Sequence, residues 1–157
     1  MTDLQVAVHR DPVWRERSDF IIGAAIEPGD TGKDTEQLWA RKIDESHFEL
    51  CCIPFFTYHL ALGDVVRTEP QGDRPYMVAE VTQPSGRFVF RVWFGGTTEP
   101  RVDILNKLES LGGLLEWSSN SMLAVDASDT DHAQLIADYL RACAAADKLV
   151  YEPGKTA

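Results

Sequence analysis

The sequence predicts a mixed α+β fold, in which a small curled, barrel-like β-sheet lobe at residues 1–84 is followed by a ferredoxin-like β-α-β-β-α-β lobe at residues 85–157. Short apolar strands with tight connections fill the first part. In the second part, two helical patterns alternate with four strands, which is the ferredoxin-like order. A chain of 157 residues can form one compact unit without needing a metal or a disulfide.

The first lobe begins with residues 1–19, which mix polar and charged groups. We expect this segment to be weakly ordered, with Trp14 docked on the rest. The apolar run Phe20–Ile26 predicts a buried strand, and the Gly, Asp and Thr content of residues 28–36 predicts a loop. Further strands are predicted at residues 38–43, 47–52 and 76–81 and in a segment that starts at residue 63. Alternation places Phe48, Leu50 and Cys52 on one strand face, with His47, Glu49 and Cys51 on the other.

A strictly alternating strand, Arg87–Phe94, opens the second lobe. Its even-numbered positions are all apolar and are expected to face a core, while its odd-numbered positions include Arg87, Arg91 and Trp93. We expect both helices to cover the apolar face. The other face is left to pack on the first lobe, an oligomer partner or a ligand. The side chains predicted to be buried under the helices are Phe88, Phe90, Val92 and Phe94.

Helix signals bracket two segments after this strand. Pro100 suits a first helical position, and Gly112-Gly113 ends that helix. A second helix begins near Asp129 or Thr130. Strands at residues 114–117, 122–126 and 149–151 complete the lobe. The apolar stripes are Leu105, Leu108 and Leu111 on the first helix, and Leu135, Ile136, Tyr139, Leu140 and Cys143 on the second.

The chain is acidic, with 25 Asp and Glu against 15 Lys and Arg and a net charge of −10. Neither lobe carries the clustered bases that phosphate neutralisation requires, so we expect no nucleic-acid binding. The run Phe20–Ile26 is too short to span a bilayer, and the N-terminus lacks a signal-peptide pattern. The three cysteines, of which Cys51 and Cys52 are adjacent, fit free thiols in a reducing compartment. These features predict a cytoplasmic protein without membrane contact.

The first candidate site is the turn at Gly63-Asp64, which follows an aromatic loop containing Tyr58 and His59. In the interpretation we favour, Asp64 holds the corner by accepting hydrogen bonds from nearby amides. In the alternative, Asp64 faces a cleft lined by Tyr58 and His59 and acts as an acid, a base or a ligand anchor.

The second candidate site is the odd-numbered face of the strand at Arg87–Phe94. Guanidinium groups bind carboxylates or phosphates through two parallel hydrogen bonds, and Trp93 adds a stacking surface. In the alternative that we favour, the arginines pair with Glu80 and other acids across the sheet, while Trp93 packs on the first lobe. Because an unpaired guanidinium is costly to bury, Arg91 should contact a carboxylate or an anion-accepting cavity. The candidate ligand-binding residues are therefore Tyr58, His59, Asp64, Arg91 and Trp93.

His47, Glu49 and Cys51 share a strand face and could begin a zinc site or a thiol-based active site. Structural zinc normally takes four ligands, and no second ligand pair follows in the sequence. A cysteine nucleophile needs a cationic or helix N-terminal setting, whereas Cys51 lies in the middle of a strand. We therefore expect no metal, no cofactor and no thiol catalysis.

Several motifs carry a resemblance to a known family. They are Trp39 on a strand, the run Phe48–Phe56 with its Ile-Pro-Phe, the element Leu60–Val66 with its Gly-Asp-Val, Ser85-Gly86 before a strand, and the Leu-rich helix that ends at Leu111-Gly112-Gly113 and is followed by Glu116. Together they resemble the bacterial family labelled domain of unknown function 4265, over residues 37–154. The resemblance implies a bacterial, intracellular protein and brings no catalytic residues with it.

Two classes of function fit these observations. The first, which we favour, is a non-enzymatic regulatory or interaction protein that contacts a partner protein or self-associates. One form is an inhibitor or immunity-type protein that masks a basic target by charge. The second is a small enzyme or small-molecule-binding domain with its pocket between the lobes. A polar, concave pocket between the lobes would favour the second class, and a flat acidic or apolar patch the first.

Overall fold

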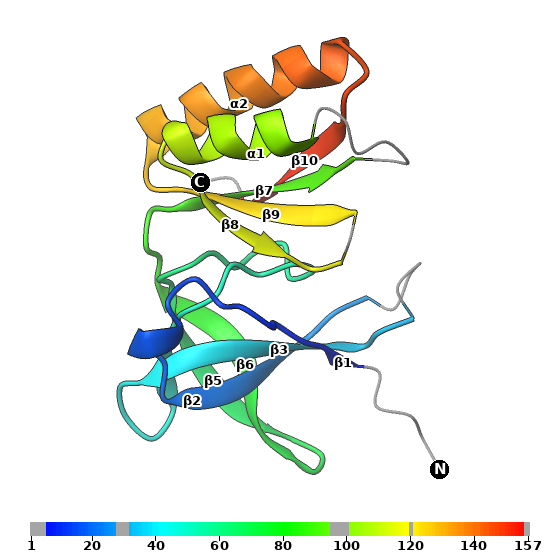
Figure 1. The fold of residues 1–157 in the computed structure, drawn as a ribbon. Coiled ribbons are helices and arrows are strands. Elements are labelled where there is room, and N and C mark those ends of the chain that lie inside the picture. Colours follow the sequence, from blue (N-terminus) through cyan, green and yellow to red (C-terminus); the bar gives the residue numbers. More distant parts are fainter. Residues whose placement is uncertain (1–5, 28–31, 95–100, 120, 156–157) are drawn as a thin grey trace.

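The computed structural model describes residues 6–27, 32–94, 101–119 and 121–155. It shows a mixed α+β protein, in which a six-stranded sheet curls into a ring and a four-stranded antiparallel sheet with two helices follows (Figure 1). The prediction of a curled β-lobe followed by an α+β lobe is therefore confirmed at this level. Within the described part of the chain, no helix is long and apolar enough to cross a membrane.

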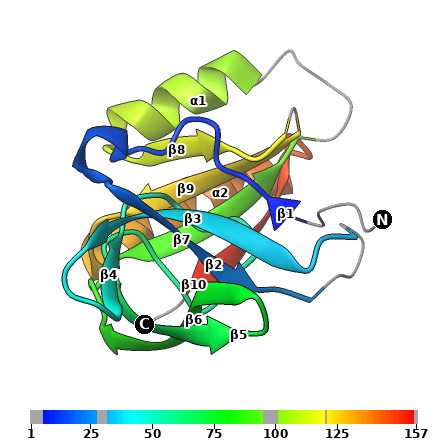
Figure 2. The same cartoon turned by 90° about the horizontal axis from the view of Figure 1, so that it is seen from below.

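Six strands form the ring. They are β1 (Val6–Ala7), β2 (Phe20–Ala25), β3 (Thr35–Lys42), β4 (His47–Leu50), β5 (Val65–Gln71) and β6 (Arg74–Gln83). The order is β1-β3-β2-β6-β5-β4, and an additional pairing of β3 with β4 closes the ring, which Figure 2 shows from below. Two pairs are parallel, β1 with β3 and β2 with β6, and the others are antiparallel.

Apolar side chains at alternate strand positions fill the ring. Leu38 on β3 and Phe48 and Leu50 on β4 are completely buried, and Cys52 belongs to the same cluster, as the alternation predicts. Strand β3 starts at Thr35, so the end of the segment predicted as a loop is a strand that pairs with β1. Residues 28–31 of that predicted loop lie outside the described residues.

The N-terminal segment differs from the weakly ordered chain predicted for residues 1–19. Its residues 1–5 lie outside the described part, but from Val6 onward it forms β1 and, at Arg15–Arg17, a turn of 3-10 helix. His9 is only 3% exposed, and the Trp14 amide donates to the Cys51 carbonyl at 3.1 Å. Apolar contacts of Ala7, Val13 and Trp14, together with the polar contacts described below, hold this segment in place.

The second sheet follows the predicted element order. Its elements are β7 (Phe88–Trp93), α1 (Arg101–Ser110), β8 (Leu114–Trp117), β9 (Met122–Ala127), α2 (Thr130–Ala145) and β10 (Val150–Lys155). The strand order is β10-β7-β9-β8, and every pair is antiparallel. Both helices lie on one face of this sheet, and the ring lies on the side of the other face (Figure 1). Pro100, predicted at the first helical position, lies outside the described residues.

The core under the helices contains the predicted face of β7. Phe90, Val92 and Phe94 are buried in it, and Phe88 is partly buried against it. The helices are rotated slightly from the predicted stripes, because the buried residues of α1 are Ile104 and Leu108, and Leu135 of α2 is 49% exposed. Asp129 caps α2, accepting a hydrogen bond from the His132 amide at 2.8 Å. The buried residues of α2 are Ala133, Ile136, Leu140 and Cys143.

Candidate functional site

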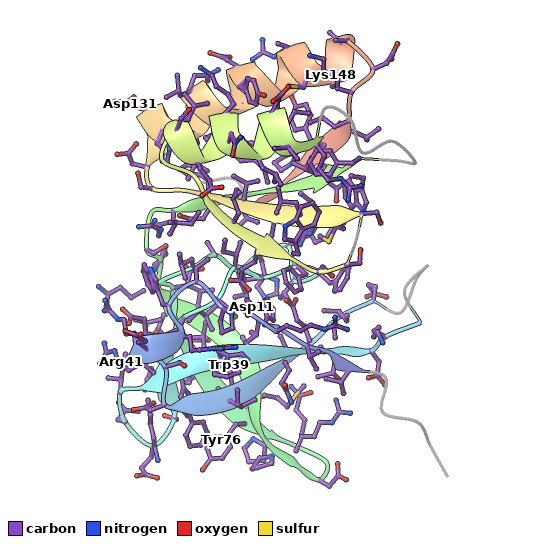
Figure 3. The ribbon with its side chains drawn as sticks, in the orientation of Figure 1. Asp11, Trp39, Arg41, Tyr76, Asp131 and Lys148 are labelled. Carbon is purple, nitrogen blue, oxygen red and sulfur yellow. The ribbon has the colours of Figure 1, made fainter. Side chains whose placement is uncertain are left out.

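The connection between β4 and β5, residues 51–64, forms a layer between the two sheets. Its first part is buried, and side chains fill the space between the sheets in Figure 3. Ile53 and Phe55 of this layer pack in one cluster with Val89 of β7 and Met122 of β9. The face of the second sheet opposite the helices therefore packs on the first lobe. Buried polar side chains from the N-terminal segment, β3, β7 and β8 surround the layer.

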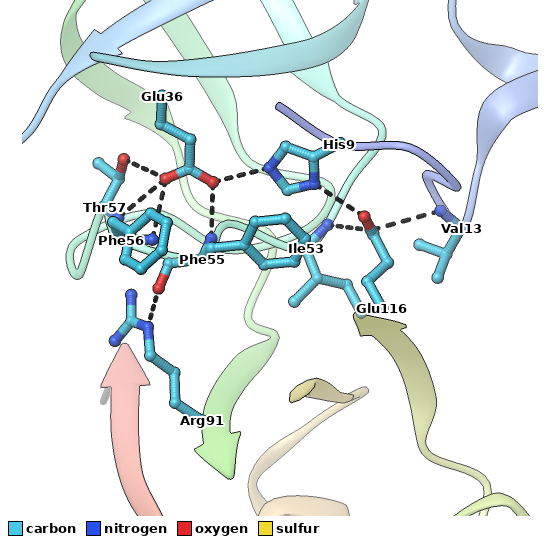
Figure 4. Close-up of polar contacts among 9 residues, drawn as sticks. All are labelled: His9, Val13, Glu36, Ile53, Phe55, Phe56, Thr57, Arg91 and Glu116. Carbon is cyan, nitrogen blue, oxygen red and sulfur yellow. Dashed lines mark hydrogen bonds and ion pairs between the residues drawn. The ribbon is translucent and has the colours of Figure 1, made fainter. Parts of the chain in front are cut away.

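A buried histidine of the N-terminal segment lies against this layer, between two buried glutamates (Figure 4). His9 Nε2 is 2.7 Å from a Glu36 carboxylate oxygen, and His9 Nδ1 is 2.8 Å from a Glu116 carboxylate oxygen. The imidazole stacks on the Phe55 ring with 3.9 Å between ring centroids. Each of the three polar side chains belongs to a residue at most 3% exposed. We call His9, Glu36 and Glu116 the buried cluster.

The two glutamates also fix the backbone of the layer. Glu36 accepts hydrogen bonds from the amides of residues 55–57 and from the hydroxyl of the last of these, at 2.6–3.1 Å. Glu116 accepts from the Ile53 amide at 2.5 Å and from the Val13 amide at 3.3 Å. Because Glu36 lies on β3 and Glu116 on β8, the buried cluster joins the N-terminal segment, the ring and the second sheet.

The electrostatics of the buried cluster favour a protonated His9. Burial by itself lowers the pKa of His9, but its contacts with Cys52, Glu116 and Glu36 outweigh burial and raise this pKa well above 6.5. Burial raises the pKa of Glu36, but hydrogen bonds from His9 and the layer amides outweigh it and lower the pKa below 4.5. Both ring nitrogens of His9 already contact carboxylates. The buried cluster therefore has a structural role, and neither nitrogen is free to exchange a proton with a substrate.

The pKa shifts predict a pH dependence of stability. The raised pKa of His9 means that its contribution is complete below about pH 6.5 and is lost as the pH rises through the folded-state pKa. The lowered pKa of Glu36 means that its contribution is present above about pH 4.5 and is lost as the pH falls through its folded-state pKa. Urea unfolding should therefore give a maximum of stability between about pH 4.5 and 6.5.

The matched variants for this pH profile are His9→Gln and His59→Gln. The first should flatten the decline of the unfolding free energy on the alkaline side, because it removes the group with the raised pKa. The second is the control, because it removes a histidine that is exposed and lies outside the buried cluster. An alkaline decline of the same size in His9→Gln and in the unsubstituted protein would contradict the assignment.

Arg91 of β7 is a further buried charge, which lies against the layer. It is 1% exposed, and its Nε donates to the Phe55 carbonyl. The guanidinium carbon lies 3.8 Å from the centre of the Tyr58 ring, and Nη1 lies 3.8 Å from a Glu152 carboxylate oxygen. The Tyr58 hydroxyl donates to that same oxygen at 2.6 Å. The structure thus brings Tyr58 and Arg91 together and adds Glu152, the neighbour of Arg91 on β10.

Arg87 and Trp93, on the same face of β7 as Arg91, make contacts within the protein. Arg87 does not pair with Glu80, which instead lies 3.5 Å from Arg67. Its guanidinium donates to both carboxylate oxygens of Asp126 on β9, with Nε 2.9 Å from one oxygen and Nη2 2.5 Å from the other. Trp93 is partly buried against the layer, in the cluster that holds Ile53 and Phe55. Arg87 therefore pairs with an acid across the sheet, as expected, but the partner is Asp126 and not Glu80.

The remaining candidates, His59 and Asp64, do not join Arg91 in one polar arrangement. Asp64 is completely buried and accepts from the Ala61 amide at 3.0 Å and the Ser85 amide at 2.8 Å. The residue before it, Gly63, has a φ of +82°, which favours glycine at this turn. Asp64 therefore holds a corner, as in the interpretation we favoured, and His59 lies exposed in the same connection.

His47, Glu49 and Cys51 do not converge on a site. His47 contacts Asp44 at 2.9 Å, and Glu49 contacts two arginines. Burial, with the Glu49 charge, raises the pKa of the Cys51 thiol to about 12, so it is protonated at neutral pH and a poor nucleophile. Among the described residues, no group of three or more His, Cys, Asp or Glu is placed to hold a metal.

Sequence reasoning missed the buried cluster. His9 lies in the segment expected to be weakly ordered, and Glu36 lies in the segment expected to be a loop. In the sequence, only the family resemblance marks Glu116. The signal that could have found Glu36 is its position two residues before Leu38, on the same face of β3, since a charge at such a position requires a buried partner.

A groove runs along the N-terminal segment and the turn between β8 and β9. It consists of two adjoining hollows of about 340 and 330 Å³, which share Arg10, Ser118 and Ser119. The first also contains an apolar part formed by Phe56, Trp93 and Met122. We call the two hollows the hairpin groove. Its charged lining residues are Arg10 and Lys33 in the first hollow and Arg10, Asp11 and Arg101 in the second.

The protein is of the α+β class, and its two sheets pack on each other through a layer with buried polar groups. The chain belongs to the family described as Domain of unknown function (DUF4265), whose model matches residues 36–151. It is similar in fold to a hypothetical protein from Neisseria gonorrhoeae, known from a crystal structure. The TM-score is 0.74 at 18% identity, and the match covers 86% of this chain and 93% of that one. No curated protein matches the sequence.

Proposed function

We propose that the protein is a binding protein that acts through protein–protein contact, and that the hairpin groove takes up an extended acidic segment of its partner. The observation that carries the proposal is the reversal of charge in the groove. Three of its four charged lining residues in the described part are cations, Arg10, Lys33 and Arg101, whereas the whole chain has 25 acidic and 15 basic residues. An acidic segment would gain from this local field and would be repelled by the remaining surface.

The edge of the ring supports an extended conformation for that segment. β1 is the last strand in its sheet order, and Val6, Ala7 and Val8 line the first hollow. Val8 is 47% exposed. A strand edge beside a groove can add a further strand, which gives affinity through main-chain hydrogen bonds and specificity through alternate side chains. Apolar side chains of the bound segment would then pack on Phe56 and Trp93, and its acidic side chains would meet the cations.

Selection from a library of random peptides tests this proposal. The recovered peptides should be rich in Asp and Glu and should alternate acidic with apolar residues. Arg10→Glu should weaken their binding by about tenfold or more, because it reverses a charge shared by both hollows. Arg141→Glu is the matched control on α2, outside the groove, and should leave the affinity within about twofold. Equal binding to both variants, or peptides without acidic enrichment, would refute the proposal.

A small-molecule ligand is the second candidate, and it is favoured by the polar hollow between the lobes, the feature expected for that class. The hollow of about 340 Å³ lies between the lobes and combines aromatic residues with serines and two cations. This volume is at the low end of the range for ligand pockets, about 300–1,000 Å³. An acid with an apolar body would fit this lining. An inhibitor or immunity-type role against a basic target rests on the net charge of −10, whereas the groove itself favours an acidic partner.

Three finer assignments accompany this proposal. The strand order β10-β7-β9-β8 with two helices on one face supports a ferredoxin-like arrangement for the second lobe. The three free, buried cysteines support a reducing, cytoplasmic setting. Val102 and Trp117, exposed to 62% and 37%, support self-association or partner contact next to the second hollow, which Trp117 also lines.

A further inference from the structure

The guanidinium of Arg91 is buried with donors that lack acceptors. Its Nε donates to the Phe55 carbonyl, but among the described residues neither Nη1 nor Nη2 has a hydrogen-bond partner. The nearest carboxylate oxygen, on Glu152, is 3.8 Å from Nη1, which is within ionic contact and beyond hydrogen-bond distance. That oxygen already accepts from the Tyr58 hydroxyl at 2.6 Å. A buried cation whose donors are unmatched is an unfavourable arrangement that an oxyanion would relieve.

The geometry of the unmatched donors defines the ligand. The two terminal nitrogens of a guanidinium lie in one plane and present parallel N–H groups, which match the two oxygens of a carboxylate. Burial lowers the pKa of Arg91, and the nearby Tyr58, Glu36 and Glu152 offset this only in part. The Glu36 charge is already balanced by His9 and by the layer amides, so it offers no acceptor to Arg91.

Two partly exposed side chains, Tyr58 and Glu152, lie next to the buried guanidinium of Arg91. Tyr58 stacks on the guanidinium and is itself 52% exposed, in a connection without regular secondary structure. The Glu152 side chain is 39% exposed and lies on β10, an edge strand of the second sheet. Rotation of these two side chains toward solvent would uncover Arg91 without moving a strand of either sheet.

We propose that Arg91 is the anchor of a carboxylate-binding site that Tyr58 and Glu152 cover in the unliganded protein. The ligand carboxylate takes both terminal nitrogens of Arg91, and the hydrogen-bonded Tyr58–Glu152 pair turns outward as a unit. The carboxylate of the ligand belongs either to a free organic acid or to an acidic side chain of a segment in the hairpin groove. Trp93, which lines the groove, lies two residues from Arg91 on the same strand face. The site itself stands on the contacts of Arg91 and does not depend on the groove.

Acetate is the probe that tests the site. Titration at constant ionic strength, followed by NMR of the Arg91 Nε–H and the Phe55 and Tyr58 amides, should give saturable shifts. Glu152→Gln should raise the acetate affinity by about fivefold, because it removes a competing exposed charge. Tyr58→Ala should also raise it by uncovering the guanidinium. Arg91→Met should abolish the shifts, while the surface control Arg67→Met should leave them unchanged.

Several outcomes would overturn the proposal. They are shifts that do not saturate, shifts centred on other cations, and an unchanged response in Arg91→Met. If Arg91→Met does not fold, an acetate affinity that rises in neither Glu152→Gln nor Tyr58→Ala is equally decisive. Peptides recovered on the groove separate the two sources, since Arg91→Met should weaken a Glu-containing peptide but not its Gln analogue if the segment supplies the carboxylate. If Arg10→Glu leaves those peptides unaffected, the groove proposal fails, and the acetate titration still decides the Arg91 site.

Discussion

Replacing Glu36 with alanine is expected to lower the free energy of unfolding by about 3–5 kcal/mol, the range for removing one partner of a buried ion pair. The substitution deprives His9 of one carboxylate and leaves the amides of residues 55–57 without their acceptor. The donors of residues 55 and 57 are buried, so water cannot replace the carboxylate there without opening the layer. Urea unfolding at pH 6, within the expected stability maximum, gives the measurement.

The matched control is Glu80→Ala, on β6. Its carboxylate is 57% exposed and pairs with Arg67 at 3.5 Å, so its removal should cost less than about 1 kcal/mol. Glu36→Gln, which keeps one acceptor oxygen, should lie between the two and serves if the alanine variant does not fold. A loss in Glu36→Ala no larger than in Glu80→Ala would show that the buried cluster contributes little.

Replacing Phe90 with alanine is expected to cost about 3–5 kcal/mol, because it removes a buried aromatic side chain and leaves a cavity. Phe90 is 7% exposed in the core between the second sheet and the helices. The cluster that contains it also holds residues of both helices and of β9, so the cavity cannot close by moving a single element. Thermal or urea unfolding measures the loss.

Leu135→Ala is the control for this core. Leu135 belongs to the stripe predicted for α2, but it is 49% exposed, so its truncation should change the unfolding free energy by less than about 1 kcal/mol. Similar losses in the Phe90 and Leu135 variants would mean that α2 packs with a different face on the sheet.

The strands and helices could be predicted because their signals are local. Strict alternation along β7 gives the face that is buried, and the Gly112-Gly113 stop and the Asp129 cap mark helix ends. The face of α1 that packs on the sheet was harder to predict. Ile104, Leu105, Leu108 and Leu111 are compatible with two adjacent stripes, and the contacts with the sheet select the one that contains Ile104 and Leu108.

The buried cluster and the Arg91 environment could not be predicted, because they depend on residues far apart in the sequence. His9 and Glu116 are 107 positions apart, and no hydropathy pattern marks a charge that is buried by pairing with another. The odd-numbered face of β7 could be proposed from strand alternation, but only the fold shows that Asp126 pairs with Arg87 while Arg91 lies under Tyr58. The assignment of Arg91 as a site anchor is accordingly a proposal from the structure.

The position of Glu116 has a consequence for the order of assembly during synthesis. A chain emerging from the ribosome contains His9, the layer and all six ring strands well before β8 exists. Until β8 arrives, His9 Nδ1 and the Ile53 and Val13 amides lack their acceptor. The layer would then have to stay hydrated, and the ring could not reach its final stability alone. We therefore expect the earliest-made segment to be among the last to dock, and the two lobes to acquire their stability together.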